Sequence, residues 1–253
     1  MKHITALALL SAASLAQPLA DAAPANCEAQ SGPRPPTVVE LYTSEGCSSC
    51  PPADRWLSTL KGRDDVLALA FHVDYWDRLG WTDRFASPAA TARQYQLARA
   101  AGGSSVYTPQ VLADGRDWRR WPGLPATSRS RQAADSPPTL KLRRDCNQIT
   151  VEVGASTSNG PAAQLAGYWA VLEDGHHSRV LAGENRGETL RHDHVVRHYQ
   201  PVPGWPAAQA QRFELAALPG AAEFPRRVAF VVTDASGRQP LQSLALSCPA
   251  TGG

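Results

Sequence analysis

The sequence lacks a marked excess of charge of either sign. Its 25 Lys and Arg residues are nearly balanced by 23 Asp and Glu residues, which gives a formal net charge of +2. Domains that bind nucleic acids carry a basic face or stripe, and this composition supplies none. We therefore expect no nucleic-acid partner.

Long apolar runs are missing after the N-terminus. The run from Ile4 to Leu19 is shorter than the roughly 20 apolar residues that span a bilayer. Ala20-Asp21-Ala22 follows, with small residues where a signal peptidase cleaves. Residues 1–22 are therefore predicted to be a signal peptide, with cleavage at 22–25. We expect a periplasmic or secreted protein with no stable membrane insertion after cleavage.

Cysteines are few, and their spacing argues against a structural zinc site. Cys47 and Cys50 form one Cys-x-x-Cys motif, and no second motif or spaced Cys/His pair completes a zinc site. Cys27, Cys146 and Cys248 remain, so at most one intramolecular disulfide joins two of these three. A Cys146–Cys248 bridge would clamp the C-terminal half, and Cys27 with either of them is the alternative. An exported chain meets an oxidising compartment in which such bridges persist.

The two halves of the chain differ in pattern. The first half alternates strands and helices, which indicates an α/β domain over residues 33–120. Residues 121–137 are rich in arginine, serine and proline and are predicted to be a linker. Short strand-like segments separated by turn signals then fill residues 138–250, as is typical of a β-sandwich. The elements expected in the first half are strands at 37–42, 66–73 and 108–113 and helices at 53–60 and 88–101.

The Cys47-Ser48-Ser49-Cys50 motif lies between a predicted strand and a predicted helix. Disulfide exchange needs a thiolate that attacks and a second thiol that resolves the mixed disulfide. Unpaired N–H groups and the dipole at a helix N-terminus stabilise such a thiolate. The motif therefore predicts Cys47 as the nucleophile and Cys50 as the resolving cysteine, in chemistry that needs no cofactor. Half of a zinc site and an inert structural disulfide are the alternatives.

Polar and aromatic residues follow the second predicted strand. In α/β sheets the carboxyl ends of strands line the crevice that binds ligands. His72, Asp74, Tyr75 and Trp76 are therefore candidates for a substrate groove, and loop packing with a hydrogen-bonded His72 is the alternative.

Several histidines occur in the C-terminal half. His192 and His194 would share one strand face, which suits chelation, but no partner carboxylate pattern accompanies them. No partner carboxylate pattern accompanies His176, His177 or His198 either. We interpret them as surface histidines and assign no metal ligand.

Three segments carry a resemblance to known proteins. ELYTSEGCSSCPPAD, FHVDYWDRLGW and YTPQVLADGR look like a family of exported proteins of unknown function known as DUF1223. The GENRG segment at 183–187 is also similar, and the resemblance spans roughly residues 36–248. The segment at 41–50 further resembles the strand and active-site loop of thioredoxins and glutaredoxins.

This resemblance implies an α/β thioredoxin-like domain followed by an all-β, sandwich-like domain. It also implies a cis peptide at Thr108-Pro109 facing the Cys-x-x-Cys motif, so Pro109 joins the catalytic set and Thr108 the substrate groove. The buried acid that assists proton transfer in thioredoxin falls at Leu41, and Glu40 would point to the other face of its strand.

We therefore expect a thiol–disulfide oxidoreductase that acts on exported protein thiols or disulfides through the Cys-x-x-Cys pair. Thioredoxin-like reduction should be inefficient because the buried acid is missing. The alternative is a non-catalytic binding module for metal, copper above all, or for protein. Its cysteines would be structural or would coordinate the metal, since soft thiolates suit Cu(I).

Overall fold

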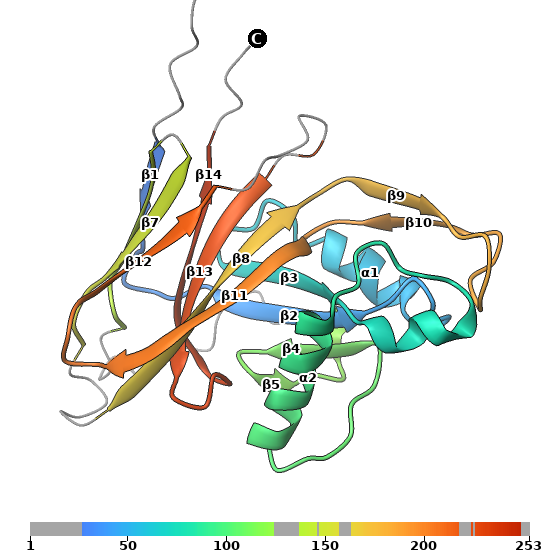
Figure 1. The fold of residues 1–253 in the computed structure, drawn as a ribbon, viewed down its shortest axis with the longest axis horizontal. Helices are drawn as coiled ribbons and strands as arrows, with labels where there is room; N and C mark the ends of the chain where they lie inside the picture. Colours follow the sequence, from blue (N-terminus) through green and yellow to red (C-terminus); the bar gives the residue numbers. More distant parts are fainter. Residues whose placement is uncertain are drawn as a thin grey trace, which may run out of the picture.

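The computed structural model describes residues 27–123, 137–145, 147–156, 163–217, 224 and 226–248. Strands dominate this part of the chain (Figure 1). The helices are α1 (Pro51–Ser58), α2 (Pro88–Ala100) and two 3-10 helices, η1 (Asp74–Leu79) and η2 (Trp121–Gly123). The strands are β1 (Cys27–Gln30), β2 (Thr37–Thr43), β3 (Val66–His72), β4 (Gln110–Ala113), β5 (Arg116–Asp117), β6 (Leu140–Asp145), β7 (Gln148–Val153), β8 (Gln164–Glu173), β9 (His176–Arg179), β10 (Thr189–His192), β11 (Val195–Pro206), β12 (Gln211–Ala216), β13 (Arg226–Asp234) and β14 (Pro240–Ser247).

One eight-stranded sheet runs through both halves of the chain, in the order β14-β13-β8-β11-β3-β2-β4-β5. Strand β11 from the C-terminal half pairs in parallel with β3 from the N-terminal half at Val195 and Ala70. The expected fold class, an α/β thioredoxin-like domain followed by an all-β, sandwich-like domain, is therefore wrong. An unpaired edge on the buried strand β3 would leave backbone groups without partners, and the start of β11 pairs with part of that edge, where the Ala70 N–H donates to the carbonyl of His194. Hydrophobic periodicity shows each strand but not which strand covers its edge.

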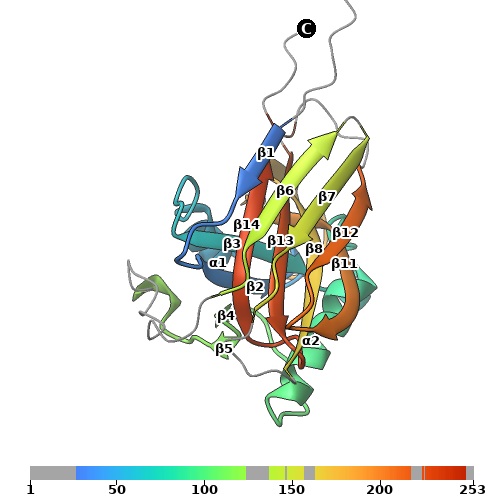
Figure 2. The same cartoon turned by 90° about the vertical axis from the view of Figure 1, so that its left-hand side faces the viewer.

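A second, four-stranded sheet lies against part of the large one (Figure 2). Its order is β1-β6-β7-β12, so the first described strand belongs to it and not to the neighbouring β2. Its apolar residues, among them Leu142 and Val151, pack with Trp169 and Phe230 of the large sheet in one core. A disulfide joins Cys27 of β1 to Cys248 just after β14. This is one of the pairings left open by the sequence, and Cys146 lies outside the described residues.

The strand β2 is buried on both faces, which explains its apolar sequence. Val39 and Leu41 pack with the α1 residues Ala53 and Leu57, whereas Tyr42 belongs to the cluster on the α2 side. Successive side chains of a strand point to opposite faces, so the sheet separates α1 from α2. Glu40 points to the α2 side, as expected, and accepts hydrogen bonds there from the side chains of Arg93, Tyr42 and Tyr168.

The β9–β10 hairpin positions the candidate site. It continues from β8 and returns into β11, and it reaches across to α1 (Figure 1). His194 adopts a positive φ of 58° where β10 passes into β11. His192 is the last residue of β10, so the hairpin brings this C-terminal segment to the start of α1.

Two predictions from the sequence fall wholly or mostly outside the described residues. The signal peptide at 1–22 lies before the first described residue, and the linker at 121–137 is described only at 121–123 and 137. The domain boundaries remain predictions. No helix in the described ranges is long and apolar enough to cross a membrane.

Candidate functional site around Cys47 and Cys50

Cys47 and Cys50 form a disulfide at the start of α1, with their Cα atoms 5.4 Å apart. Cys50 is the N-cap residue, and the backbone N–H groups of Ala53 and Asp54 donate to its carbonyl. The prolines that follow Cys50 occupy the first helical positions and carry no N–H. The helix start therefore offers fewer free donors to a thiolate than its position alone would suggest.

A hydroxyl lies close to the sulfur of the predicted nucleophile. The Oγ atom of Ser49 is 3.4 Å from the Sγ atom of Cys47, within reach of a hydrogen bond to sulfur. Ser48 and Ser49 are exposed, whereas both cysteines are fully buried. The Cys47 sulfur is thus shielded from solvent in this closed, oxidised state.

The loop between β9 and β10 covers the motif. The Nδ2 atom of the buried Asn185 donates to the carbonyls of Glu45 and Cys47, at 2.8 and 3.0 Å. The carboxylate of Glu184 accepts from both the N–H and the hydroxyl of Ser48. Hydrogen bonding to Ser48 lowers the pKa of Glu184. Sequence reasoning assigned no site role to these two residues, and their only signal was the GENRG segment shared with the family.

The Thr108-Pro109 peptide is cis. Trp76 connects this turn to the cysteine motif, because its indole Nε1 donates to the Thr108 hydroxyl at 2.8 Å. A Cβ atom added at Gly46 would lie 3.1 Å from the Cβ atom of Trp76, so the same residue also touches the turn before Cys47. Thr108, Trp76 and the Cys47 turn are thereby brought together.

Asp74 and Tyr75, the other groove candidates, bind α2 instead. Asp74 exchanges hydrogen bonds with Thr91, and the Tyr75 hydroxyl donates to the side chain of Gln94. Burial raises the pKa of Tyr75 to about 12. These contacts hold η1 against α2 and so fix the position of Trp76.

A surface hollow of about 380 Å³ adjoins the cis peptide. It is lined by Tyr107, Pro109, Val111, Trp118, Arg119 and Trp121. Trp121 also packs against Trp56 of α1, with ring centroids 5.3 Å apart, which places the hollow beside the helix that follows Cys50. Sequence reasoning missed Trp118 and Trp121, because they lie in the stretch around the predicted linker.

His72 is buried behind the motif and does not line a surface groove. Its Nδ1 atom is 2.6 Å from the carboxylate of Asp83, and both side chains are fully buried. Burial opposes ionisation of Asp83, but the adjacent His72 outweighs it and lowers the pKa of Asp83 to about 2. The Nε2 atom of His72 has no hydrogen-bond partner among the described residues.

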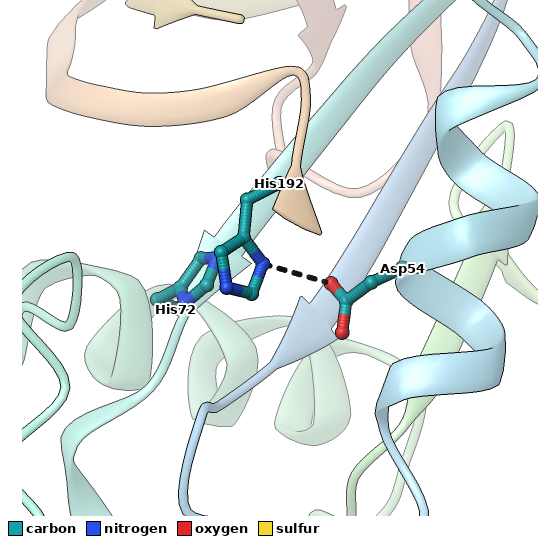
Figure 3. A group of neighbouring side chains, drawn as sticks. All are labelled: Asp54, His72 and His192. Carbon is teal, nitrogen blue, oxygen red and sulfur yellow. Dashed lines mark ion pairs between the residues drawn. The ribbon is translucent and has the colours of Figure 1, made fainter. Parts of the chain in front are cut away.

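His192 lies between two carboxylates that flank the cysteine motif in sequence (Figure 3 shows Asp54). Its Nε2 atom is 3.3 Å from Oε1 of Glu45, and its Nδ1 atom is 3.9 Å from Oδ1 of Asp54. Burial acts to lower the pKa of His192, but the two carboxylates outweigh it and raise that pKa to about 9. Burial likewise acts to raise the pKa of Glu45, and contact with His192 lowers it overall.

The histidines expected at the surface are mostly buried. His176, His192 and His194 are inside the protein, whereas His177 is exposed. His194 does not share a β10 face with His192. Burial and the nearby Arg227 lower the pKa of His194 to about 4.

Asp54, His72 and His192 converge although they come from α1, β3 and β10 (Figure 3). One potential ligand atom from each lies within 4.8 Å of the other two. Two imidazoles and a carboxylate are a common donor set for transition metals. The sequence pattern could not reveal this group, because its members are far apart in the chain.

Two solved structures are similar to this chain in fold. The X-ray crystal structure of protein AGR_C_4864 from Agrobacterium tumefaciens is similar, with 27% identity and a TM-score of 0.63 over 83% of this chain and 93% of that one. HBP35 of Porphyromonas gingivalis is similar in fold, with 14% identity and a TM-score of 0.52 over 85% and 76% of the two chains. No curated protein matches the sequence.

The family model for proteins of unknown function named DUF1223 matches residues 38–233. That range contains the cysteine motif, the cis peptide and Asn185. It also contains Asp54, His72 and His192. The chain therefore belongs to the DUF1223 family.

Proposed function

We propose that this protein is an exported thiol–disulfide oxidoreductase that acts through Cys47 and Cys50. The observation that carries the proposal is the Cys47–Cys50 disulfide at the start of a helix, with a cis-proline turn linked to it by Trp76. The predicted signal peptide supports export. Two disulfides in the described residues also suit an oxidising compartment.

The exchange takes place in two balanced steps. A thiolate of the partner protein attacks Sγ of Cys47, which forms a mixed disulfide and releases Cys50 as a thiolate. A second thiolate of the partner then attacks the partner sulfur atom that is bonded to Cys47 in that mixed disulfide. This step releases Cys47 as a thiolate. The partner leaves with a new disulfide, and the Cys47–Cys50 pair is left reduced. Reduction of a partner disulfide is the reverse sequence, with Cys47 as the attacking thiolate.

Ser49 supports the reactivity of Cys47. Its hydroxyl can donate to the Cys47 thiolate at the 3.4 Å separation seen here. This donor compensates in part for the N–H groups that the two prolines at the start of α1 do not provide. Replacement of Ser49 by alanine should therefore slow disulfide exchange through Cys47.

The hollow beside Pro109 offers a site for the partner chain. Its aromatic residues Tyr107, Trp118 and Trp121 supply apolar contact area next to the cis peptide. The fully buried Cys47 requires one further step, since a partner thiol reaches the sulfur only after the loop that carries Asn185 moves away.

The test is a trapping experiment with the full chain and, as partner, a model protein that carries an accessible disulfide. The Cys47 thiolate of Cys50→Ser attacks that disulfide, forms a mixed disulfide and releases the other partner cysteine as a thiolate. Cys50→Ser should accumulate a mixed disulfide through Cys47, because the resolving thiol is missing. A Cys47→Ser/Cys50→Ser control should trap nothing, and Cys27→Ser/Cys248→Ser should behave like the parent protein. The proposal fails if Cys50→Ser forms no adduct and the Cys47–Cys50 disulfide stays oxidised in mild thiol reductant.

A further inference from the structure

The buried group behind the cysteine motif contains an unusual concentration of polar atoms without hydrogen-bond partners. Among the described residues these atoms include Nε2 of His72, Oε1 of Glu45 and both ring nitrogens of His192. The His192 nitrogens make only ion-pair contacts, at 3.3 Å to Glu45 and 3.9 Å to Asp54, without hydrogen-bond geometry. Buried polar atoms in native proteins are almost always satisfied, and an exception calls for an explanation such as a bound ion. The three residues are at most 2% exposed.

The side chains that carry these atoms are close neighbours. The rings of His72 and His192 meet edge to face with centroids 5.0 Å apart. The carboxylate of Asp54 uses Oδ2 to accept from the Thr43 hydroxyl, at 2.9 Å, and its Oδ1 faces His192. The geometry points to a binding site for a divalent transition-metal ion, with Zn²⁺ as the test ion, formed by His72 Nε2, His192 Nδ1 and Asp54 Oδ1.

The outer contacts of both imidazoles fit this assignment. A histidine that binds a metal through one nitrogen usually donates its other N–H to a carboxylate or carbonyl, which fixes the tautomer. Nδ1 of His72 contacts Asp83, which leaves Nε2 for the metal. Nε2 of His192 faces Glu45, which leaves Nδ1 for the metal. Each imidazole thus has a carboxylate on the side away from the proposed ion.

The spacing needs a small adjustment. Zinc takes nitrogen and oxygen ligands at about 2.0–2.2 Å, so tetrahedral ligand atoms lie roughly 3.3–3.6 Å apart. One ligand atom from each of Asp54, His72 and His192 lies within 4.8 Å of the other two, and His192 Nδ1 is 3.9 Å from Asp54 Oδ1. Side-chain shifts on the order of 1 Å would bring such atoms to bonding distance. Three protein ligands leave a fourth position for water or another ligand.

The site is distinct from the copper site considered from the sequence, because it uses no cysteine. It also does not rest on the proposed exchange reaction. Asp54 lies one helical turn after Cys50, and its backbone N–H donates to the Cys50 carbonyl at 3.2 Å. A bound ion would therefore hold the first turn of α1 to the β9–β10 hairpin.

The test measures zinc in the full chain after production in zinc-supplemented medium and gel filtration with a weak chelator. We expect one Zn²⁺ per chain in the parent protein, and loss of it in His72→Gln and His192→Gln. His177→Gln is the matched control, because this exposed histidine lies on the neighbouring strand β9 and should leave zinc content unchanged. Glu45→Gln should weaken zinc binding by about 10–100-fold.

Two further measurements keep the outcome decisive. If the histidine variants fail to fold, Co²⁺ binding is measured instead, in the folded parent protein and in Asp54→Asn. We expect the visible spectrum of bound Co²⁺ to differ between these two proteins. Cys47→Ser/Cys50→Ser should retain zinc, which separates this site from the exchange reaction. Absence of zinc from the parent protein, equal zinc in the parent and His192→Gln, or loss of zinc in the cysteine variant would overturn the assignment.

Discussion

The contact between Asn185 and the cysteine turn should control how fast the Cys47–Cys50 disulfide reacts. Asn185→Ala removes two buried hydrogen bonds, to the carbonyls of Glu45 and Cys47. Each neutral hydrogen bond contributes about 1 kcal/mol, and leaving a buried acceptor unpaired adds to the loss. We therefore expect the closed loop to lose about 2–3 kcal/mol relative to an open state in which Cys47 is accessible.

This free-energy difference determines the rate at which the Cys47–Cys50 disulfide is reduced. Because Cys47 is fully buried, a thiol reagent reaches it only from the open state. When opening and closing are fast, the reaction rate follows the population of that state. At one factor of ten per 1.36 kcal/mol, Asn185→Ala should accelerate reduction by about 30- to 150-fold. The measurement is the rate of reduction by dithiothreitol, followed by quenched alkylation and mass spectrometry.

A matched control separates local opening from general loss of stability. Leu215→Ala removes a buried side chain from β12, in the core of the second sheet, and should cost about 2–5 kcal/mol of unfolding free energy. We expect it to leave the reduction rate nearly unchanged. A change of less than about threefold in Asn185→Ala, or equal acceleration in both variants, would refute the reasoning.

Three other outcomes are expected. Arg93→Met leaves the buried carboxylate of Glu40 without its cation and should lower the free energy of unfolding in urea by about 3–5 kcal/mol. The double variant Arg93→Met/Glu40→Gln should recover part of this loss. Burial raises the pKa values of Tyr75 and Tyr107 to about 12, so phenolate absorbance should show them titrating near pH 12. Because these folded-state pKa values lie above the ordinary value of about 10, their stabilisation is complete below pH 10 and disappears as pH rises towards 12. Trp118→Ala should raise the KM for a protein thiol and leave reduction by dithiothreitol unchanged; equal effects on both would exclude the hollow as a partner site.

Features set by neighbouring residues could be predicted from the sequence. Ser87 caps α2 as its side-chain oxygen accepts from the N–H of Ala90, and Pro88 starts the helix. The apolar run at 66–72 forms β3, and the cysteine motif lies between β2 and α1. Local propensity and periodicity determine such features, because the interacting atoms are only a few residues apart.

The tertiary structure alone decided how these pieces share sheets and sites. Pairing of β11 with β3 merges strands from both halves, and this pairing overturned the expected fold class. Edge pairing depends on which exposed backbone groups meet in space, and one-dimensional periodicity does not encode that information.

The same distinction holds for the candidate site. The sequence by itself determined that Cys47 and Cys50 lie one turn apart at a helix start, since their spacing and the following prolines dictate it. It could not show that the β9–β10 hairpin covers Cys47 or that His192 meets His72 and Asp54. Those contacts join residues that are distant in the chain, and only the packing of the hairpin against α1 brings them together.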